Sequence, residues 1–156
     1  MIIIDFDASA TALTGYKDVD KLQTSLFTST VFIMPVRFQA NGIELFGFED
    51  DPWSEAPVMC LATEVVEIVK ELKSTIKENY IIIEGPGDIE FTMIDNENVK
   101  IDFYEGSEHI ITTVKYDELL EALLKYSKKL RKFLWERVPE LNDHPYWGPW
   151  LRGERD

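Results

Sequence analysis

Apolar and polar side chains alternate most regularly between residues 80 and 115, in four short segments separated by the turn sequences GPGD, DNEN and EGSE. Alternation with a period of two is typical of strands with one buried face, and connections this short join antiparallel neighbours. The pattern predicts a four-stranded meander over residues 80–84, 89–94, 99–104 and 109–115. Its expected inward side chains are Ile89, Phe91, Met93, Val99, Ile101 and Phe103.

A hairpin is predicted around the dipeptide Asn41-Gly42. Both residues tolerate the positive φ angles of a type I′ turn. Residues 29–38 ahead of the turn are rich in β-branched and aromatic side chains, which favour a strand. Pro35 within this segment cannot donate a backbone hydrogen bond, so an edge position or a bulge is expected. Residues 43–48 are expected to return as the second strand.

Two amphipathic helices are predicted from apolar residues that recur three and four positions apart. The first covers residues 61–78, with Thr63 as an N-cap if the helix begins late. The second covers residues 116–138 and ends at Pro139, and in both helices acidic residues come first and basic residues last. Residues 139–156, which contain HPYWGPWLRGERD, are expected to form an irregular aromatic tail.

Together with a short buried strand at residues 2–6 and a loop over residues 8–27 with at most one helical turn, these elements predict a single α+β domain over residues 1–156. We expect one antiparallel sheet of about six to seven strands, made of the hairpin and the four-strand meander. The two amphipathic helices are expected to pack mainly on one face of it.

The charge of the chain is strongly negative and unevenly distributed. Residues 1–115 hold 21 acidic and 8 basic side chains, whereas residues 116–156 hold 8 of each, so the net charge of -13 lies ahead of the last helix. This argues against nucleic-acid and anionic-membrane partners and favours a basic partner protein. The alternative is that the acidity only maintains solubility. No apolar run approaches the ~20 residues of a membrane span, and the N-terminus lacks a secretory pattern, so a cytoplasmic location is expected.

No residues stand out as a catalytic, cofactor or metal site. The single cysteine, Cys60, has apolar neighbours and is interpreted as a small buried hydrophobe. The DFD motif at residues 5–7 has metal-motif spacing but lacks a third ligand, and GPGD at residues 85–88 is interpreted as a turn. His109 is expected at the start of a strand, and His144 is expected to bond to backbone. Whether the protein is an enzyme stays open.

The densest acidic segment follows the hairpin and contains a tryptophan. Under one interpretation the acids form a solvated loop and Trp53 closes the end of the sheet. Under the other, an exposed Trp53 and the acids form a binding surface for a basic partner. Trp147 and Trp150 in the tail pose the same choice. The candidate partner-binding residues are Glu44, Glu49, Asp50, Asp51, Trp53 and Glu55.

The segments NGIELFGFEDDPW and YDELLEALLKYSKKLRKFL, separated by a meander, resemble in layout the small acidic immunity proteins of bacterial polymorphic toxin systems. This resemblance implies a cytoplasmic, non-catalytic protein that covers the active site of one toxin. An acidic inhibitor of a toxin nuclease would imitate nucleic acid.

Two other classes of function remain open. One is a small-molecule-binding or hydrolytic domain with a pocket between the sheet and the C-terminal helix. The other is an oligomeric structural protein, including a homodimer, which would self-pair through an edge strand marked by Pro35. Aromatic residues that could line the pocket are Phe46, Phe48, Phe91, Phe103, Tyr104 and Trp135.

Overall fold

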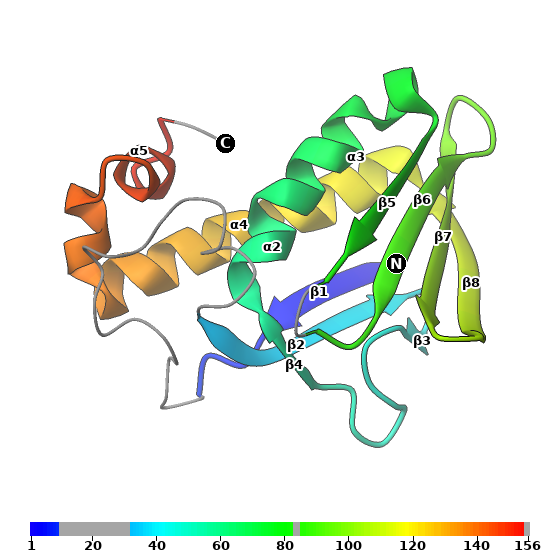
Figure 1. The fold of residues 1–156 in the computed structure, drawn as a ribbon, viewed down its shortest axis with the longest axis horizontal. Coiled ribbons are helices and arrows are strands. Elements are labelled where there is room, and N and C mark those ends of the chain that lie inside the picture. The colour runs from blue at the N-terminus through cyan, green and yellow to red at the C-terminus, as the bar shows by residue number, and fades with distance from the viewer. Residues whose placement is uncertain (10–31, 83–84, 155–156) are drawn as a thin grey trace.

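A computed structural model describes residues 1–9, 32–82 and 85–154 of the chain (Figure 1). It is an α+β protein with two four-stranded antiparallel sheets. The expected strand at residues 29–38 lies partly outside the described residues, and the expected loop at residues 8–27 lies almost entirely outside them. The expected single sheet is therefore wrong: the hairpin and the meander form separate sheets, because no strand pairing joins them in the described part of the chain.

Sheet A contains β1 (Ile2–Phe6), β2 (Ile33–Ala40), β3 (Ile43–Glu44) and β4 (Ser54–Pro57). The strand β2 is central, with β1 along one side and both β3 and β4 along the other. Pro35 therefore does not lie in an edge strand, contrary to expectation. Its carbonyl accepts a 2.9 Å hydrogen bond from the amide of Asp7. Its missing N–H lies opposite the carbonyl of Asp7, just past the end of β1, so only the reciprocal bond at that end of the ladder is absent.

The hairpin turn has the predicted conformation, with φ angles of 53° at Asn41 and 79° at Gly42. The return strand is much shorter than predicted, because Leu45 and Phe46 are buried consecutively and the alternation of a strand is broken. The chain leaves β2 after Glu44 and comes back as β4 at Ser54.

The expected helix over residues 61–78 is divided into α2 (Val58–Ala62) and α3 (Glu64–Thr75). Thr63 lies between them with φ -124° and ψ -80°, and its hydroxyl donates a 2.8 Å bond to the carbonyl of Met59 instead of capping α3. At the other end Ile76 adopts φ 72°, which ends the helix and turns the chain directly into β5 (Lys77–Ile81). The helix is therefore shorter, and the strand earlier, than predicted.

Sheet B is an uninterrupted meander of β5, β6 (Asp88–Met93), β7 (Asn98–Glu105) and β8 (Glu108–Lys115). The six side chains expected to face inward are all buried, which confirms the predicted phase of its two central strands. The side chain of Asn41 connects the two sheets, because its amide donates to Thr112 Oγ1 at 3.0 Å and to the carbonyl of Thr113 at 2.7 Å.

The long helix α4 (Tyr116–Arg137) begins where predicted and contacts β1, α2, α3 and β8. The tail is more regular than expected, since it forms the 3-10 helix η2 (Pro139–Asp143) and the short helix α5 (Trp147–Leu151). Trp147 and Trp150 are fully buried and pack edge to face with ring centroids 6.0 Å apart. These two tryptophans therefore close the core. Figure 1 shows η2 and α5 gathered at the C-terminal end of α4.

Candidate functional site

Two surfaces of opposite charge stand out. The first is the acidic loop, which we define as residues 47–55; it covers most of the connection between β3 and β4 and the first two residues of β4. The amide of Phe48 donates a 2.8 Å hydrogen bond to the carbonyl of Asp51, which closes a tight turn. Gly47 is required there, because a Cβ atom at this position would collide with the backbone of Asp51 and Pro52. The turn is thus specified by local backbone contacts.

The structure separates the six predicted partner-binding residues into three groups. Glu49, Asp50, Asp51 and Glu55 are exposed on the acidic loop. Trp53 is half-buried, so it is neither the closed plug nor the fully exposed anchor that the sequence suggested.

Glu44 belongs with the body of sheet A and not with the acidic loop. Its side chain is only 7% exposed, and its Oε1 accepts bonds from Arg37 Nε at 2.9 Å, Arg37 Nη2 at 2.5 Å and Gln39 Nε2 at 2.9 Å. The hydrogen bond to Glu44 raises the pKa of the Arg37 guanidinium, which stays charged. Glu44 is therefore held inside a structural ion pair.

Phe48 is the aromatic residue that the sequence analysis did not place in this surface. It is 75% exposed and is followed directly by the three consecutive acids of the loop. The signal that could have found it is Gly47, which breaks the expected return strand immediately before Phe48. An exposed phenylalanine of this degree has no role in the core and is a candidate contact residue.

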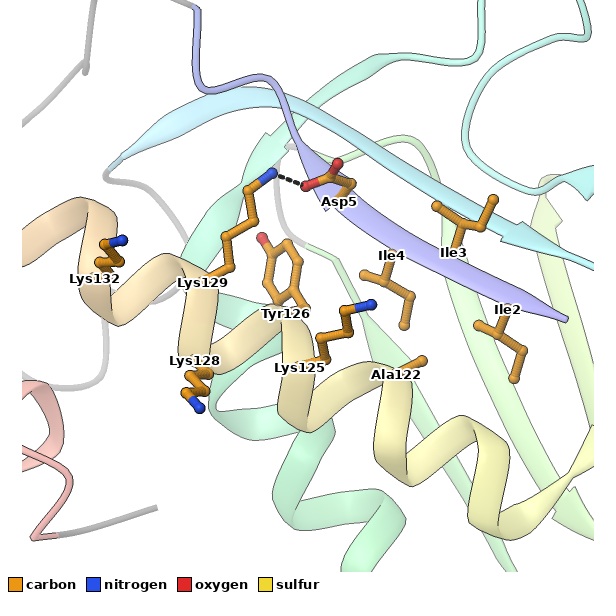
Figure 2. Close-up of a pocket in the computed structure, with 10 residues that line it drawn as sticks. All are labelled: Ile2, Ile3, Ile4, Asp5, Ala122, Lys125, Tyr126, Lys128, Lys129 and Lys132. Carbon is orange, nitrogen blue, oxygen red and sulfur yellow. Dashed lines mark hydrogen bonds and ion pairs between the residues drawn. The ribbon is translucent and has the colours of Figure 1, made fainter.

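The second surface is the lysine groove, which lies between the strand β1 and the helix α4 and has a volume of about 680 Å³. Figure 2 shows the apolar side chains of Ile2, Ile4 and Ala122 between the two elements. The full lining consists of Ile2, Ile3, Ile4, Asp5, Ala122, Lys125, Tyr126, Lys128, Lys129 and Lys132.

Positive charge gathers along one side of the lysine groove. The lining contains four lysines and one acid, Asp5, a net charge of +3 within a chain of net charge -13. Lys129 is paired with the carboxylate of Asp5 on β1 (Figure 2). Its ammonium lies 4.7 Å from the centroid of the Phe6 ring. Lys125, Lys128 and Lys132 are exposed and show no ion pair in the described part of the chain.

The lysine groove rests on buried contacts. Tyr126 packs edge to face on Phe6 at 5.8 Å, and its hydroxyl donates a 2.8 Å bond to the carbonyl of Val58 in α2. Phe133 also packs edge to face on Phe6, with ring centroids 5.1 Å apart. The helix α4 is therefore held against α2 by a polar contact and against β1 by edge-to-face ring contacts.

The aromatic residues proposed from sequence as pocket lining do not line the lysine groove, although the rings of Phe46 and Phe103 are in contact with centroids 5.4 Å apart. Phe46, Phe91 and Phe103 are buried in the core, whereas Phe48 and Trp135 are exposed. Tyr104 lies on the open face of sheet B, where its hydroxyl donates a 2.9 Å bond to Asn79 Oδ1. The lysine groove has none of these six residues in its lining.

His109 lies at the start of β8 as predicted, and it contacts an acid that the sequence analysis missed. Its Nδ1 lies 2.8 Å from Asp102 Oδ1, and its ring stacks on Tyr104 with centroids 5.2 Å apart. The hairpin register explains this contact, since it places Asp102 diagonally opposite His109 on one face. Among the described residues this pair bonds to no hydroxyl or thiol that could act as a nucleophile.

His144 and Cys60 have structural surroundings. His144 Nδ1 accepts 3.1 Å bonds from the amides of Tyr146 and Trp147, so the predicted backbone role is confirmed. Cys60 is buried as predicted, and burial raises the pKa of its thiol to about 12, which keeps it protonated and unreactive.

Both acids of the DFD motif make contacts with other side chains or with backbone. Asp5 pairs with Lys129, and Asp7 accepts hydrogen bonds from the amide and hydroxyl of Ser9. No cluster of three or more His, Cys, Asp or Glu side chains suited to a metal ion occurs in the described ranges.

The chain matches no protein-family model, and no curated protein or solved structure is significantly similar to it. Within the part of the chain that the structure describes, no helix has the length and apolar character needed to cross a membrane.

Proposed function

We propose that this protein is a non-catalytic binding module that recognises a basic partner protein through the acidic loop. The observation that carries the proposal is the position of Phe48, which is 75% exposed beside Glu49, Asp50 and Asp51. An aromatic residue surrounded by charge is the arrangement found at the centre of many protein interfaces, where the ring fills a pocket and the charges set orientation.

The charge of the whole chain supports the same proposal. A net charge of -13 attracts a basic partner over a distance of about one Debye length and accelerates its association. The exposed acids then act mainly on the rate of association, whereas Phe48 acts mainly on the rate of dissociation. The two kinds of contact can therefore be distinguished by kinetics.

The partner class that we propose is a toxin domain with a basic substrate-binding surface, in keeping with the resemblance to immunity proteins. Covering such a surface needs no catalytic group on the inhibitor. It needs carboxylates that replace the phosphates of the substrate and an apolar contact that slows release.

The test uses association and dissociation rates measured by surface plasmon resonance against a basic toxin domain encoded next to this gene. We expect Phe48→Ala to raise Kd by roughly 10- to 100-fold, mainly through faster dissociation. We expect the triple variant E49Q/D50Q/D51Q to associate more slowly than the parent. This difference in association rate should shrink as NaCl is raised from about 50 to about 500 mM, because salt screens the charges.

Matched controls are Ile111→Ala, an exposed apolar residue on β8, and E105Q/E108Q on the β7–β8 turn. These should leave both rates within about twofold of the parent, as expected for residues outside an interface. The proposal is wrong if the controls weaken binding as much as the loop variants do, or if binding is independent of salt.

A further inference from the structure

We infer that the lysine groove is a second binding site, which takes an extended acidic segment of a protein as an additional strand on β1. This site goes beyond the proposed function, because it lies on other elements and has the opposite charge. Three observations carry the inference: the backbone groups on the outer edge of β1, the way that edge is closed at one end, and the charge of α4 beside it.

The outer edge of β1 offers unpaired backbone groups. Antiparallel pairing directs the N–H and C=O groups of alternate residues toward the partner strand and those of the intervening residues away from it. Bonds from the amide of Asn41 to the carbonyl of Met1 (3.0 Å) and from the amide of Asp7 to Pro35 fix the phase, so that Ile3 and Asp5 face β2. The N–H and C=O groups of Ile2 and Ile4 therefore point outward, along the lysine groove.

The edge is protected at its far end and open at its beginning. The carboxylate of Asp5 accepts a 2.9 Å bond from the amide of Phe6 and is itself paired with Lys129. No described residue bonds to the outward groups of Ile2 and Ile4. By comparison, the outer edge of β8 is met by the side chain of Asn41, which donates to the carbonyl of Thr113. Side chains that cover an edge prevent further pairing, so β1 is left able to pair over Ile2–Ile4.

The chemistry of the groove selects an acidic occupant with alternating apolar residues. A strand presents successive side chains on opposite faces, so one set can cover Ile2, Ile4 and Ala122 while the other reaches the exposed lysines. Because four lysines line the groove and only Lys129 is paired among the described residues, with Asp5, three cations remain available and the favourable occupant is anionic. Addition of a strand to an exposed edge supplies backbone bonds for affinity and side chains for specificity.

The test uses fluorescence anisotropy with a labelled, capped eight-residue peptide of alternating glutamate and valine. We expect it to bind the intact protein at micromolar concentrations. A peptide of the same sequence with N-methyl groups on alternate residues loses the N–H donors and should bind at least tenfold more weakly. Hydrogen exchange followed by NMR should show protection of the Ile2 and Ile4 amides when the parent peptide is added.

Two sets of protein variants distinguish the effect of the groove lysines on peptide binding from the effect of the total net charge. The triple variant K125Q/K128Q/K132Q should raise the Kd of the parent peptide at least tenfold, while the matched triple K77Q/K100Q/K115Q, on sheet B, should change it less than twofold. The inference is overturned if the peptide does not bind at 1 mM, or if the N-methylated peptide binds equally well. It is also overturned if sodium palmitate binds with lysine dependence while the peptide does not compete, which would indicate a small anionic amphiphile as the occupant.

Discussion

The acidic loop and the lysine groove are built in different ways. The acidic loop is held by a local turn between Phe48 and Asp51, and its four carboxylates are exposed to solvent. The lysine groove is formed by a strand and a helix from opposite ends of the chain, and Asp5 and Lys129, which span it, are 124 residues apart. One surface is therefore a product of local sequence, and the other is a product of the fold.

The total net charge of this protein does not describe both of its charged surfaces. The value of -13 describes residues 1–115, where the acidic loop lies. It does not describe the segment 125–132, where five cations share two turns of α4. A domain with both surfaces can attract a basic partner at one place and an acidic segment at another.

The largest expected difference between the two regions is in stability, and it is tested by removing one phenylalanine from each. Phe6→Ala deletes a ring that contacts Tyr126 and Phe133, and should lower the free energy of unfolding by about 3–5 kcal/mol. Phe48→Ala removes an exposed ring and should change it by less than ~0.5 kcal/mol. Urea denaturation of both variants measures this. Equal losses would mean that the acidic loop is part of the core.

Sheet B shows how much of the fold could be predicted from the sequence. Its strands are neighbours in the chain, and short turns bring Ile89, Phe91, Ile101 and their inward neighbours to one face, so local alternation was sufficient. The Asn41-Gly42 turn was predictable for the same reason, since its φ angles depend on these two residues alone.

Elements that depend on distant contacts were not predictable. The strand β4 follows Pro52 and ends with Pro57, so the sequence does not favour a strand here. It forms because β2 offers a free edge beside Met34 and Val36. The sequence of the tail predicts irregular structure, yet α5 forms because Trp150 is buried next to α4. The guanidinium of Arg131 on α4 lies 4.8 Å from the centroid of the Trp150 ring.

The lysine groove was missed because its residues look ordinary in the sequence. Lys125, Lys128 and Lys132 have the spacing of a solvated helix face, and Ile2 and Ile4 have the pattern of a buried strand. The exposure of Phe48 in the acidic loop was not predicted, since it depends on the turn at Gly47.

A smaller expected effect concerns the ion pair between Arg37 and Glu44 in sheet A. Arg37→Met would leave the carboxylate of Glu44 buried and without its cation, and should cost about 1.5–3 kcal/mol of unfolding free energy. Glu44→Gln keeps an oxygen that can accept from Arg37 and should cost less. The measurement is urea denaturation at pH 7. If Arg37→Met is neutral while partner binding is lost, Glu44 is a contact residue, as the sequence analysis supposed, and not a structural one.

The smallest expected effect concerns the ion pair across the lysine groove. Lys129→Met removes the cation that faces Asp5, but both side chains are about half exposed, so the loss of unfolding free energy should be only ~0–1 kcal/mol. The methionine retains the apolar contact with Phe6, which limits the loss to the charge itself. The measurement is thermal and urea denaturation in 50 mM and 1 M NaCl, where screening should remove most of the difference.

Lys128→Met is the matched control, because it removes the same charge from the same helix without breaking an ion pair in the described part of the chain. If both variants lose stability equally and independently of salt, the Lys129–Asp5 pair contributes nothing, and the far end of β1 is protected by the bond from Phe6 to Asp5 alone. If only Lys129→Met is salt-dependent, the pair helps to keep that edge closed. The acidic segment should then extend its pairing toward Asp5 in the Lys129→Met variant, which hydrogen exchange at Phe6 would reveal.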